Sequence, residues 1–405
     1  MPATSVIARV PQESRAHIIR SDAEALEVVT ALSDEFRQDA AKRDRERILP
    51  YAEIEKLGQS GFFGICVPRE HGGADVSAAT VAEAFRLLGA ADPSIGQIPQ
   101  NHFCWLAIIA NGTEAQQRFF FERVLAGDRI GNAHSENTKN KPGVHTHDLV
   151  RVAGGWRITG RKFYSTGAIF AQWIPFIAAD ETGASKMFFT AADAKGLEVV
   201  DDWNGMGQRT TASGTTIFND VFVPDEHVFP YSKTEVDAKS FMYNAQLIHT
   251  AIDVGIAEEV LGEARRYIHQ HNRPWTGNPY DEHAREPFVV AEFGKLSLRV
   301  RTAAAMLGRA AAAVDAMRAA PSKQSIIDAR LAIADARVVA GEVAVDVSTE
   351  FFGITGARAT LPQFGLDRHW RNARTHTLHD PLRWKYFHIG NYYLNDVVPE
   401  AGTYI

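Results

Sequence analysis

The chain has 405 residues, 45% of them hydrophobic and 23% charged, so we expect a globular protein with a core large enough for more than one substructure. Its net charge of −6 provides no basic field for nucleic acid, and two cysteines, Cys66 and Cys104, are too few for a disulfide framework. No apolar run reaches the ~20 residues that span a bilayer and the N-terminus lacks a signal-peptide core, so we expect a cytoplasmic protein that binds neither nucleic acid nor a membrane.

Helical patterns dominate the first part of the chain. Residues 21–36 place apolar side chains on one face at the 3.6-residue period, with Ser21 or Asp22 as the cap. Further runs begin at or near Ser, Thr or Pro and end near Gly or Asn, namely 76–91, 93–110 and 113–127. We predict an N-terminal helical domain over residues 1–127.

The pattern changes to strands after Gly127. Residues 150–168 hold two short alternating runs joined at Gly154 and Gly155, which indicates a β hairpin. Strand-like composition continues in 187–193, 197–203 and 215–224. We predict a small β domain, a barrel or a sandwich, over residues 128–235.

Long helices follow the β domain. Helical runs of about twenty residues or more cover 241–271, 287–317, 322–352 and a last stretch that begins at 367. Alanine-rich faces permit close helix contact, so we predict a four-helix bundle over residues 236–405 and an α+β fold overall. This order of domains resembles the acyl-CoA dehydrogenase fold. Large alanine-rich faces are usually buried against a partner, so we also expect a homotetramer, a dimer of dimers.

The segment KFYSTGA, residues 162–168, ends the first hairpin. Thr, Ser and Gly are ordinary at the end of a strand, and a purely structural role is the alternative. In the acyl-CoA dehydrogenase family a Lys-x-x-x-Thr segment at this place contacts the flavin. The resemblance therefore implies that Thr166 contacts flavin N5 and that Tyr164 and Ser165 line the isoalloxazine.

The segment GNAHSENTKN, residues 131–140, stands where the family has its flavin-binding loop. Ser and Asn also form turns without any ligand. The neutral side chains of Asn132, Ser135 and Asn137 suit the pyrimidine edge of a flavin, which needs hydrogen bonds rather than charge. We expect these residues to bind the cofactor.

Two further segments match places where this family meets a flavin, often that of a neighbouring subunit. NRPWTG, residues 272–277, ends the first bundle helix, and its Arg273 is the expected phosphate ligand because a guanidinium matches phosphate geometry. A solvated arginine at a helix end is the alternative. FGITGARAT, residues 352–360, supplies the remaining expected cofactor contacts, Gly353, Gly356 and Arg358.

The segment THTLHDP, residues 375–381, holds two histidines and an aspartate. His376, His379 and Asp380 are compatible with a metal site, although a fourth ligand would have to come from elsewhere. They are equally compatible with a helix end at which Pro381 enforces the break. By the family pattern Asp380 falls where many acyl-CoA dehydrogenases carry a catalytic glutamate, which makes Asp380 a cofactor-contacting residue or a base.

Several longer segments together resemble the flavin-dependent monooxygenases built on this fold, in particular the dibenzothiophene monooxygenases and the sulfur-acquisition oxidoreductases. The matching segments are VPREHGGAD, AADPSIGQIPQNHF, HSEN, DDWNGMGQRTTASGTT and HWRNARTHTLHDP, and they cover nearly the whole chain. The resemblance implies catalytic roles for His379 first, for His102 of the NHF segment second, and for Thr166. An imidazole with a pKa near ~6.5 can donate to an oxygenated flavin or deliver a proton. His376 lies on the same helical face as His379 and is expected to orient it or to touch substrate.

The function that follows from this resemblance is a two-component monooxygenase. It takes reduced FMN from a separate NAD(P)H:FMN reductase, forms a flavin C4a-hydroperoxide with O2 and transfers one oxygen atom to an organosulfur compound. No GxGxxG motif follows a strand, which agrees with reduction elsewhere. The alternatives are an acyl-CoA dehydrogenase that uses FAD with Asp380 as base, an aromatic or amine hydroxylase, and a non-catalytic flavin-binding protein. We expect no bound metal.

Overall fold

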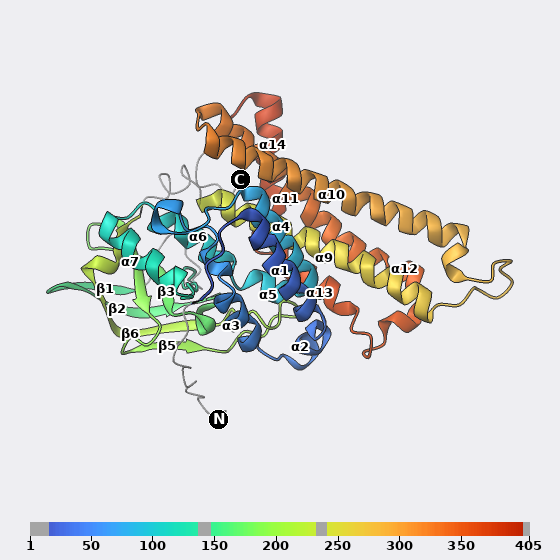
Figure 1. Cartoon of the computed structure of the whole chain (residues 1–405), viewed down its shortest axis with the longest axis horizontal. Helices are drawn as coiled ribbons and strands as arrows, with labels where there is room; N and C mark the ends of the chain where they lie inside the picture. The colour runs from blue at the N-terminus through green and yellow to red at the C-terminus, as the bar shows by residue number, and fades with distance from the viewer. Residues whose placement is uncertain (1–15, 137–146, 232–240, 400–405) are drawn as a thin grey trace.

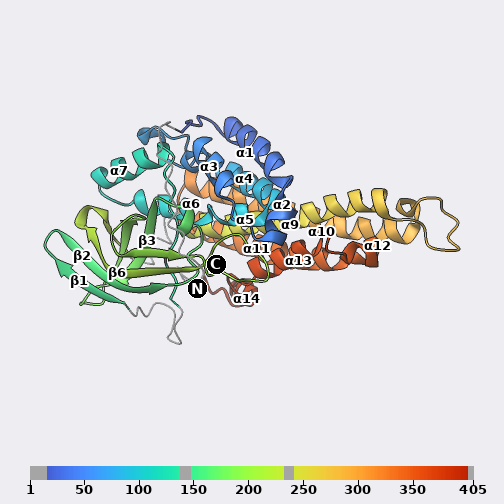
Figure 2. The same cartoon turned by 90° about the horizontal axis from the view of Figure 1, so that it is seen from below.

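The computed structural model describes residues 16–136, 147–231 and 241–399. Helices at the beginning of the chain, strands in its middle and long helices at its end form three successive parts (Figure 1). The strands gather at one end of the molecule, and the paired helices α9 and α10 project from the other end (Figures 1 and 2). The α+β architecture expected from the sequence is therefore confirmed.

The N-terminal helices form where the apolar periodicity predicts them. Ser21 caps α1, because its side chain accepts a hydrogen bond from the backbone N–H of Glu24. The run 93–110 was expected as one helix but forms two, since Pro99 has no N–H with which to continue the helical ladder. The helices are α1 (Asp22–Arg37), α2 (Ala40–Glu46), α3 (Tyr51–Gln59), α4 (Ala78–Ala91), α5 (Pro93–Gln97), α6 (Gln100–Ile109) and α7 (Glu114–Leu125).

The β part is a sandwich of two antiparallel sheets. One sheet has the strand order β1-β2-β6-β5 and the other the order β3-β4-β7. The predicted hairpin is present, with Val152 paired to Gly155. The sheets bury a shared aromatic core in which the Phe176 ring centroid lies 4.7 Å from that of Phe218 and 5.0 Å from that of Phe188. The strands are β1 (Asp148–Val152), β2 (Gly155–Lys162), β3 (Trp173–Ala179), β4 (Ser185–Ala191), β5 (Leu197–Val200), β6 (Thr215–Pro224) and β7 (Val228–Pro230); β3 and β7 were not predicted.

Three long helices and a broken fourth make the bundle. The last predicted run is interrupted after His376, because Pro381 starts a new helix and helical backbone before a proline is disfavoured. Among the described residues no helix combines the length and apolarity needed to cross a membrane. The helices are α9 (Phe241–His271), α10 (Pro287–Ala319), α11 (Lys323–Glu350), α12 (Phe352–Thr355), α13 (Asp367–His376) and α14 (Leu382–Asn395).

Helix α9 is held tightly against α4 by two glycines. A Cβ on Gly89 would lie 2.8 Å from the Cα of Ile252, and a Cβ on Gly255 would lie 2.3 Å from the carbonyl oxygen of Arg86. Side chains larger than hydrogen therefore do not fit at either position. The close contact fixes the register of α9, and with it the positions of the polar side chains on the same stretch.

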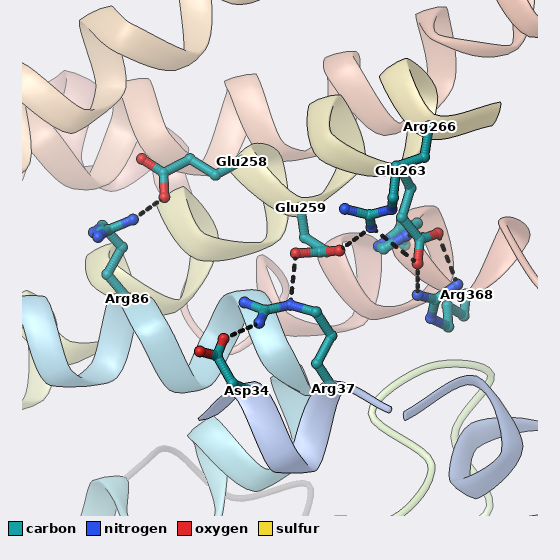
Figure 3. A network of polar contacts seen from close by, with 9 residues as sticks. Asp34, Arg37, Arg86, Glu258, Glu259, Glu263, Arg266 and Arg368 are labelled. Atoms are coloured by element: carbon teal, nitrogen blue, oxygen red, sulfur yellow. Dashed lines mark hydrogen bonds and ion pairs between the residues drawn. The ribbon is translucent and has the colours of Figure 1, made fainter. Parts of the chain in front are cut away.

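A network of ion pairs ties α9 to α1, α4 and α13 (Figure 3). Arg37 Nε lies 3.1 Å from Glu259 Oε2, and Arg86 pairs with Glu258. Toward the end of α9, Glu263 Oε2 accepts from Arg368 Nη1 at 3.1 Å and from His369 Nε2 at 2.9 Å. The first turn of α13 is thereby anchored to α9, which determines where the last residue of α13, His376, is placed.

Candidate functional site

The end of strand β2 continues into a polar, tightly turned segment. Tyr164 has a positive φ of 54° and is exposed, whereas Ser165 and Thr166 are buried. Thr166 Oγ1 lies 2.6 Å from Ser213 Oγ, and Ser213 Oγ lies 2.8 Å from Thr211 Oγ1. A non-glycine residue with positive φ is uncommon and often belongs to a functional site. The strand end thus presents a hydroxyl row that is held by the loop before β6.

The predicted flavin-binding loop lies directly on this strand end. Asn132 Nδ2 donates to the carbonyl oxygen of Tyr164 at 3.3 Å, and the backbone N–H of Phe163 donates to the carbonyl oxygen of Ser135 at 2.8 Å. Asn132 Oδ1 and Ser165 Oγ are buried and have no hydrogen-bond partner among the described residues. Such atoms normally have a partner. Asn137, a further expected ligand, lies outside the described residues.

These orphaned polar atoms fit a flavin. Asn132 Oδ1 accepts and Ser165 Oγ both donates and accepts, and both side chains are neutral. The pyrimidine edge of an isoalloxazine offers complementary neutral donors and acceptors. The donor set at the strand end therefore suits this cofactor, while its atoms remain unsatisfied by the protein.

Two contacts connect the strand end to the bundle. Gly167, with a φ of 78°, packs so closely on the carbonyl oxygen of Ile98 that a Cβ there would lie 2.9 Å away. The backbone N–H of Gln208 donates to Asn372 Oδ1 on α13 at 2.7 Å. Both contacts end beside His376. Gln97, which precedes Ile98, contacts the His376 side chain, and His376 lies one helical turn after Asn372 on α13.

His376 is the centre of a buried polar cluster. His376 Nδ1 donates to Asp253 Oδ1 at 2.6 Å, and His376 Nε2 lies 2.9 Å from His249 Nδ1 and 3.1 Å from Gln97 Oε1. His249, Asp253 and His376 are all at most 3% exposed. His249 and Asp253 are four residues apart on α9 and so lie on one face, opposite the end of α13.

The charges around this cluster are nearly balanced. Arg337 on α11 pairs with Asp253, and Arg337 Nη2 is 3.7 Å from Asp380 Oδ1. Burial lowers the pKa of His376, with partial compensation by Asp253. Burial, together with the neighbouring imidazoles and Arg337, lowers the pKa of His249 well below its ordinary value. Both imidazoles are therefore neutral near pH 7.

Both carboxylate oxygens of Asp380 have partners. Its Oδ2 pairs with Lys385 and its Oδ1 lies 3.3 Å from His379 Nδ1. Burial raises the pKa of Asp380, but the His379 hydrogen bond and the charges of Arg337 and Lys385 outweigh burial and hold this pKa far below its usual range. Asp380 therefore has no free oxygen with which to contact a flavin or to abstract a proton.

His379 lies at the outer side of the cluster. Its side chain is 46% exposed, and its ring centroid lies 4.2 Å from that of His249. Of the four predicted catalytic residues, His376 and His379 are therefore adjacent, and Thr166 is linked to them through Ile98 and Gln97. No group of three or more His, Cys, Asp or Glu side chains in the described part of the chain has an arrangement suited to a metal ion.

His102, the second of the expected catalytic histidines, is hydrogen-bonded to the backbone through both of its ring nitrogens. Its Nε2 donates to the carbonyl oxygen of Phe63 at 2.8 Å, and its Nδ1 accepts from the backbone N–H of Ile130 at 3.1 Å. The ring is fully buried, and burial lowers its pKa to about 4. These two hydrogen bonds connect α6 to the segment that leads into the β sandwich, and the catalytic role of His102 stays a prediction.

The remaining predicted cofactor ligands lie at the far tip of the bundle. Asn272 Nδ2 donates to the carbonyl oxygen of Thr355 at 3.1 Å, which brings the segment of Arg273 next to that of Gly353, Gly356 and Arg358. All four of these residues are exposed. Since α9 has 31 residues and rises ~1.5 Å per residue, this group is about 35 Å from His249 within one chain.

Sequence reasoning missed His249, Asp253 and Arg337. A signal for the first two was present, because QLIHTAID places a histidine and an aspartate four residues apart in an otherwise apolar helical run. Polar residues at that spacing on a buried face require partners. The partners come from α11 and α13, which no local pattern identifies.

Comparisons with known proteins identify the family to which the chain belongs. Residues 23–128 match the family described as acyl-CoA dehydrogenase, N-terminal domain, and residues 247–384 match acyl-CoA dehydrogenase, C-terminal domain. A probable FMNH2-dependent monooxygenase, SfnC, of Pseudomonas putida is 30% identical over 94% of this chain and 97% of its own.

Two solved structures are similar over 94% of this chain. FMN-bound TdsC of Paenibacillus sp. A11-2, a dibenzothiophene monooxygenase, has a TM-score of 0.88 at 30% identity and is covered over 100% of its chain. Methanesulfinate monooxygenase MsuC of Pseudomonas fluorescens has a TM-score of 0.86 at 29% identity and is covered over 99% of its chain.

Proposed function

Because the chain belongs to the flavin-dependent monooxygenases that share the acyl-CoA dehydrogenase fold, we propose that it transfers one oxygen atom from O2 to an organosulfur compound, using reduced FMN. SfnC is described as FMNH2-dependent, and TdsC was solved with FMN bound. The substrate is a sulfinate, a sulfone or a thioether. A separate NAD(P)H:FMN reductase supplies the reduced flavin by diffusion, and both proteins act in the cytoplasm.

The flavin ring is held at the end of β2. Asn132 and Ser165 bind its pyrimidine edge through the atoms that lack partners in the chain, Thr166 and Tyr164 contact the ring system, and Ser135 shapes the loop. When bound, reduced FMN supplies the two electrons with which O2 is activated. The protein's own contribution is to hold these contacts, to exclude water and to place proton-carrying groups beside the ring.

The imidazole cluster supplies those proton-carrying groups, and it is the observation that carries the proposal. His376 is oriented by Asp253, buried from water and linked through Gln97 and Ile98 to the Thr166 segment. A buried, neutral imidazole that a carboxylate orients can take up a proton or deliver one. His379, whose ring is tilted by 38° against that of His249, forms the solvent-exposed side of the cluster.

The competing dehydrogenase reaction requires a carboxylate base above the substrate. Asp380 holds the position expected for that base, but both of its oxygens are engaged and its pKa is held too low for proton abstraction. Asp380 instead fixes the turn between α13 and α14 through Lys385. This contact supports the oxygenase over the dehydrogenase.

The split cofactor set supports an assembly of copies. Arg273, Gly353, Gly356 and Arg358 are too distant from Asn132 and Thr166 to share one FMN within a chain, since α9 separates the two groups along most of its length. The exposed tip therefore contacts the FMN phosphate of a neighbouring copy. We take the assembly to be a homotetramer.

The experiment uses purified protein, a flavin reductase, NADH, FMN and 18O2. The substrates are methanesulfinate, dimethyl sulfone, dibenzothiophene, indole and a primary aromatic amine, and products are read by mass spectrometry together with hydrogen peroxide release. We expect one 18O atom in a sulfur product and little peroxide. Oxygenation of only indole or the amine would replace the organosulfur assignment, and bleaching of bound FAD by an acyl-CoA would establish the dehydrogenase instead.

A further inference from the structure

His249 is a buried imidazole that lies outside all of the motifs, and its ring is a direct neighbour of His376. Its Nδ1 faces His376 Nε2 at 2.9 Å, while the other nitrogen of His376 donates to Asp253 at 2.6 Å. Asp253 is fixed from behind by Arg337, which is fully buried. Asp253, His376 and His249 therefore follow one another as a carboxylate, an imidazole and a second imidazole. In such an arrangement the carboxylate orients the first imidazole, which can then exchange a proton with the next group.

We propose that His249 is the terminal proton carrier of a relay formed by Asp253, His376 and His249, which delivers a proton to the reacting centre and recovers it. The role rests on the proposed monooxygenase function. Transfer of one oxygen atom of O2 leaves the other to depart as water, and formation of that water takes up protons. The relay supplies one of these protons. The relay can be tested by a measurement that requires neither FMN nor turnover.

The proton balance follows from these contacts. In the unloaded state both rings are neutral, each with its proton on Nδ1, so that His249 donates to His376 Nε2 and His376 donates to Asp253. In the loaded state His376 carries protons on both nitrogens, and His249 carries its single proton on Nε2. Delivery from His249 Nε2 is accompanied by movement of the His376 Nε2 proton to His249 Nδ1, so one proton leaves and no electron moves.

The surroundings accept the loaded state. Gln97 Oε1 lies 3.1 Å from His376 Nε2 and can accept from it when that nitrogen is protonated. The charged and titratable groups that face the relay are Asp253 on α9, Arg337 on α11, His379 and Asp380 after α13, and Lys385 on α14. Asp253 favours a cation at His376, whereas Arg337 opposes it. Loading therefore occurs below the ordinary pH range of histidine.

The first test is nuclear magnetic resonance of the full chain without FMN, with 15N-labelled histidine rings. Signals are assigned by their loss in His249→Asn and His376→Asn, with His249→Gln as a second assignment variant. As the pH falls from 8 to 5 we expect His376 to become cationic while His249 remains neutral and changes from the Nδ1–H to the Nε2–H tautomer. A single His249 tautomer throughout, or protonation of both its nitrogens before His376, would overturn the relay.

The second test separates carrying a proton from filling space. The amide of His249→Asn can still donate to His376 Nε2, but it cannot exchange tautomers. We expect an unchanged Tm and unchanged FMN affinity, a loss of oxygenated product of about 100-fold and a matching rise in hydrogen peroxide. His227→Gln is the control, because His227 is a partly buried imidazole whose pKa is also lowered by burial but which packs on Phe119 of α7.

The outcomes are distinct. Full product yield in His249→Asn would show that His249 only supports His376 and would end the proposal. A wild-type protein that oxidises none of the substrates would remove the proposed function, whereas the tautomer measurement would still decide whether the relay exists.

Discussion

Two clusters of the same residue types lie between α9 and α13. The anchor cluster, Glu263, Arg368 and His369, joins the first turn of α13 to α9. The relay cluster, Asp253, Arg337, His376 and His249, lies at the last turn of α13. Each contains a carboxylate, a buried arginine and a buried imidazole, so composition alone does not distinguish a structural group from a functional one.

The difference lies in which atoms remain available. In the anchor cluster both Glu263 oxygens accept from Arg368, and one also accepts from His369, so the group is closed. In the relay cluster a second imidazole and Gln97 share one nitrogen of His376, and Arg337 Nε and Nη2 lack hydrogen-bond partners among the described residues. Alternative partners for one proton are a requirement for proton transfer, and the anchor cluster has none.

The largest expected effect is on the yield of oxygenated product, when one imidazole in each cluster is replaced and the two variants are compared. His376→Asn keeps a donor toward Asp253, and His369→Gln keeps a donor toward Glu263, but neither can carry a proton. We expect oxygenated product to fall by about 100-fold or more in His376→Asn, because general acid and base catalysis typically contributes 10²- to 10⁴-fold. We expect His369→Gln to stay within about threefold, since general acid and base catalysis is not lost there.

Product yield, peroxide release and Tm are measured for both variants. If His369→Gln lost as much product as His376→Asn while remaining folded, the distinction between a closed and an open cluster would be wrong.

The anchor cluster should instead control stability. Glu263→Gln leaves Arg368 buried without its carboxylate partner, and breaking a buried pair in this way typically costs 3–5 kcal/mol. Because Glu263 retains some exposure, we expect the free energy of unfolding to fall by about 2–4 kcal/mol in urea titrations. Arg368→Met together with Glu263→Leu is the matched control, and this double variant should recover most of the loss. A single variant as stable as the wild type would contradict the anchoring role.

The two clusters should also act together on acid stability. Burial lowers the pKa of His369 and of His376 from the ordinary value of 6.5, so the folded state stays neutral where the unfolded chain takes up protons. The free energy of unfolding is therefore expected to be constant above pH 7 and to fall as the pH decreases below 6.5. Burial raises the pKa of Glu263, but the charge of Arg368 and the hydrogen bonds from Arg368 and His369 outweigh burial and hold this pKa down, so a second loss follows below pH 4.5.

Urea midpoints between pH 4 and 8 test this dependence. His369→Gln should flatten the slope between pH 5 and 6.5 and leave the slope above pH 7 unchanged. A slope of the opposite sign, with stability gained on acidification, would mean that the imidazoles are protonated in the folded state.

The sequence predicted the architecture better than the site. Periodicity gave α9, α10 and α11 nearly to their ends, because long apolar patterns are local. His376 was also found from the sequence, because the motif THTLHDP is a contiguous segment. The cluster itself depends on residues that only the fold brings together, since His249 and His376 are 127 positions apart. His102 was located by a matching segment of the sequence, but its two hydrogen bonds to the backbone of Phe63 and Ile130 are seen only in the structure.

The smallest expected effect lies at the outer end of the same ion-pair network. Arg37 bridges Asp34 and Glu259, and its side chain is 31% exposed (Figure 3). Exposed pairs contribute little because water screens the charges and the side chains lose freedom, so Arg37→Gln should cost about 0.5 kcal/mol. High salt should remove this difference but leave most of the Glu263→Gln effect, since buried pairs are screened less. A loss of unfolding free energy in Arg37→Gln as large as that in Glu263→Gln would mean that the network acts as one cooperative unit. The stabilising role assigned to the anchor cluster would then belong to the whole network of ion pairs that Figure 3 shows.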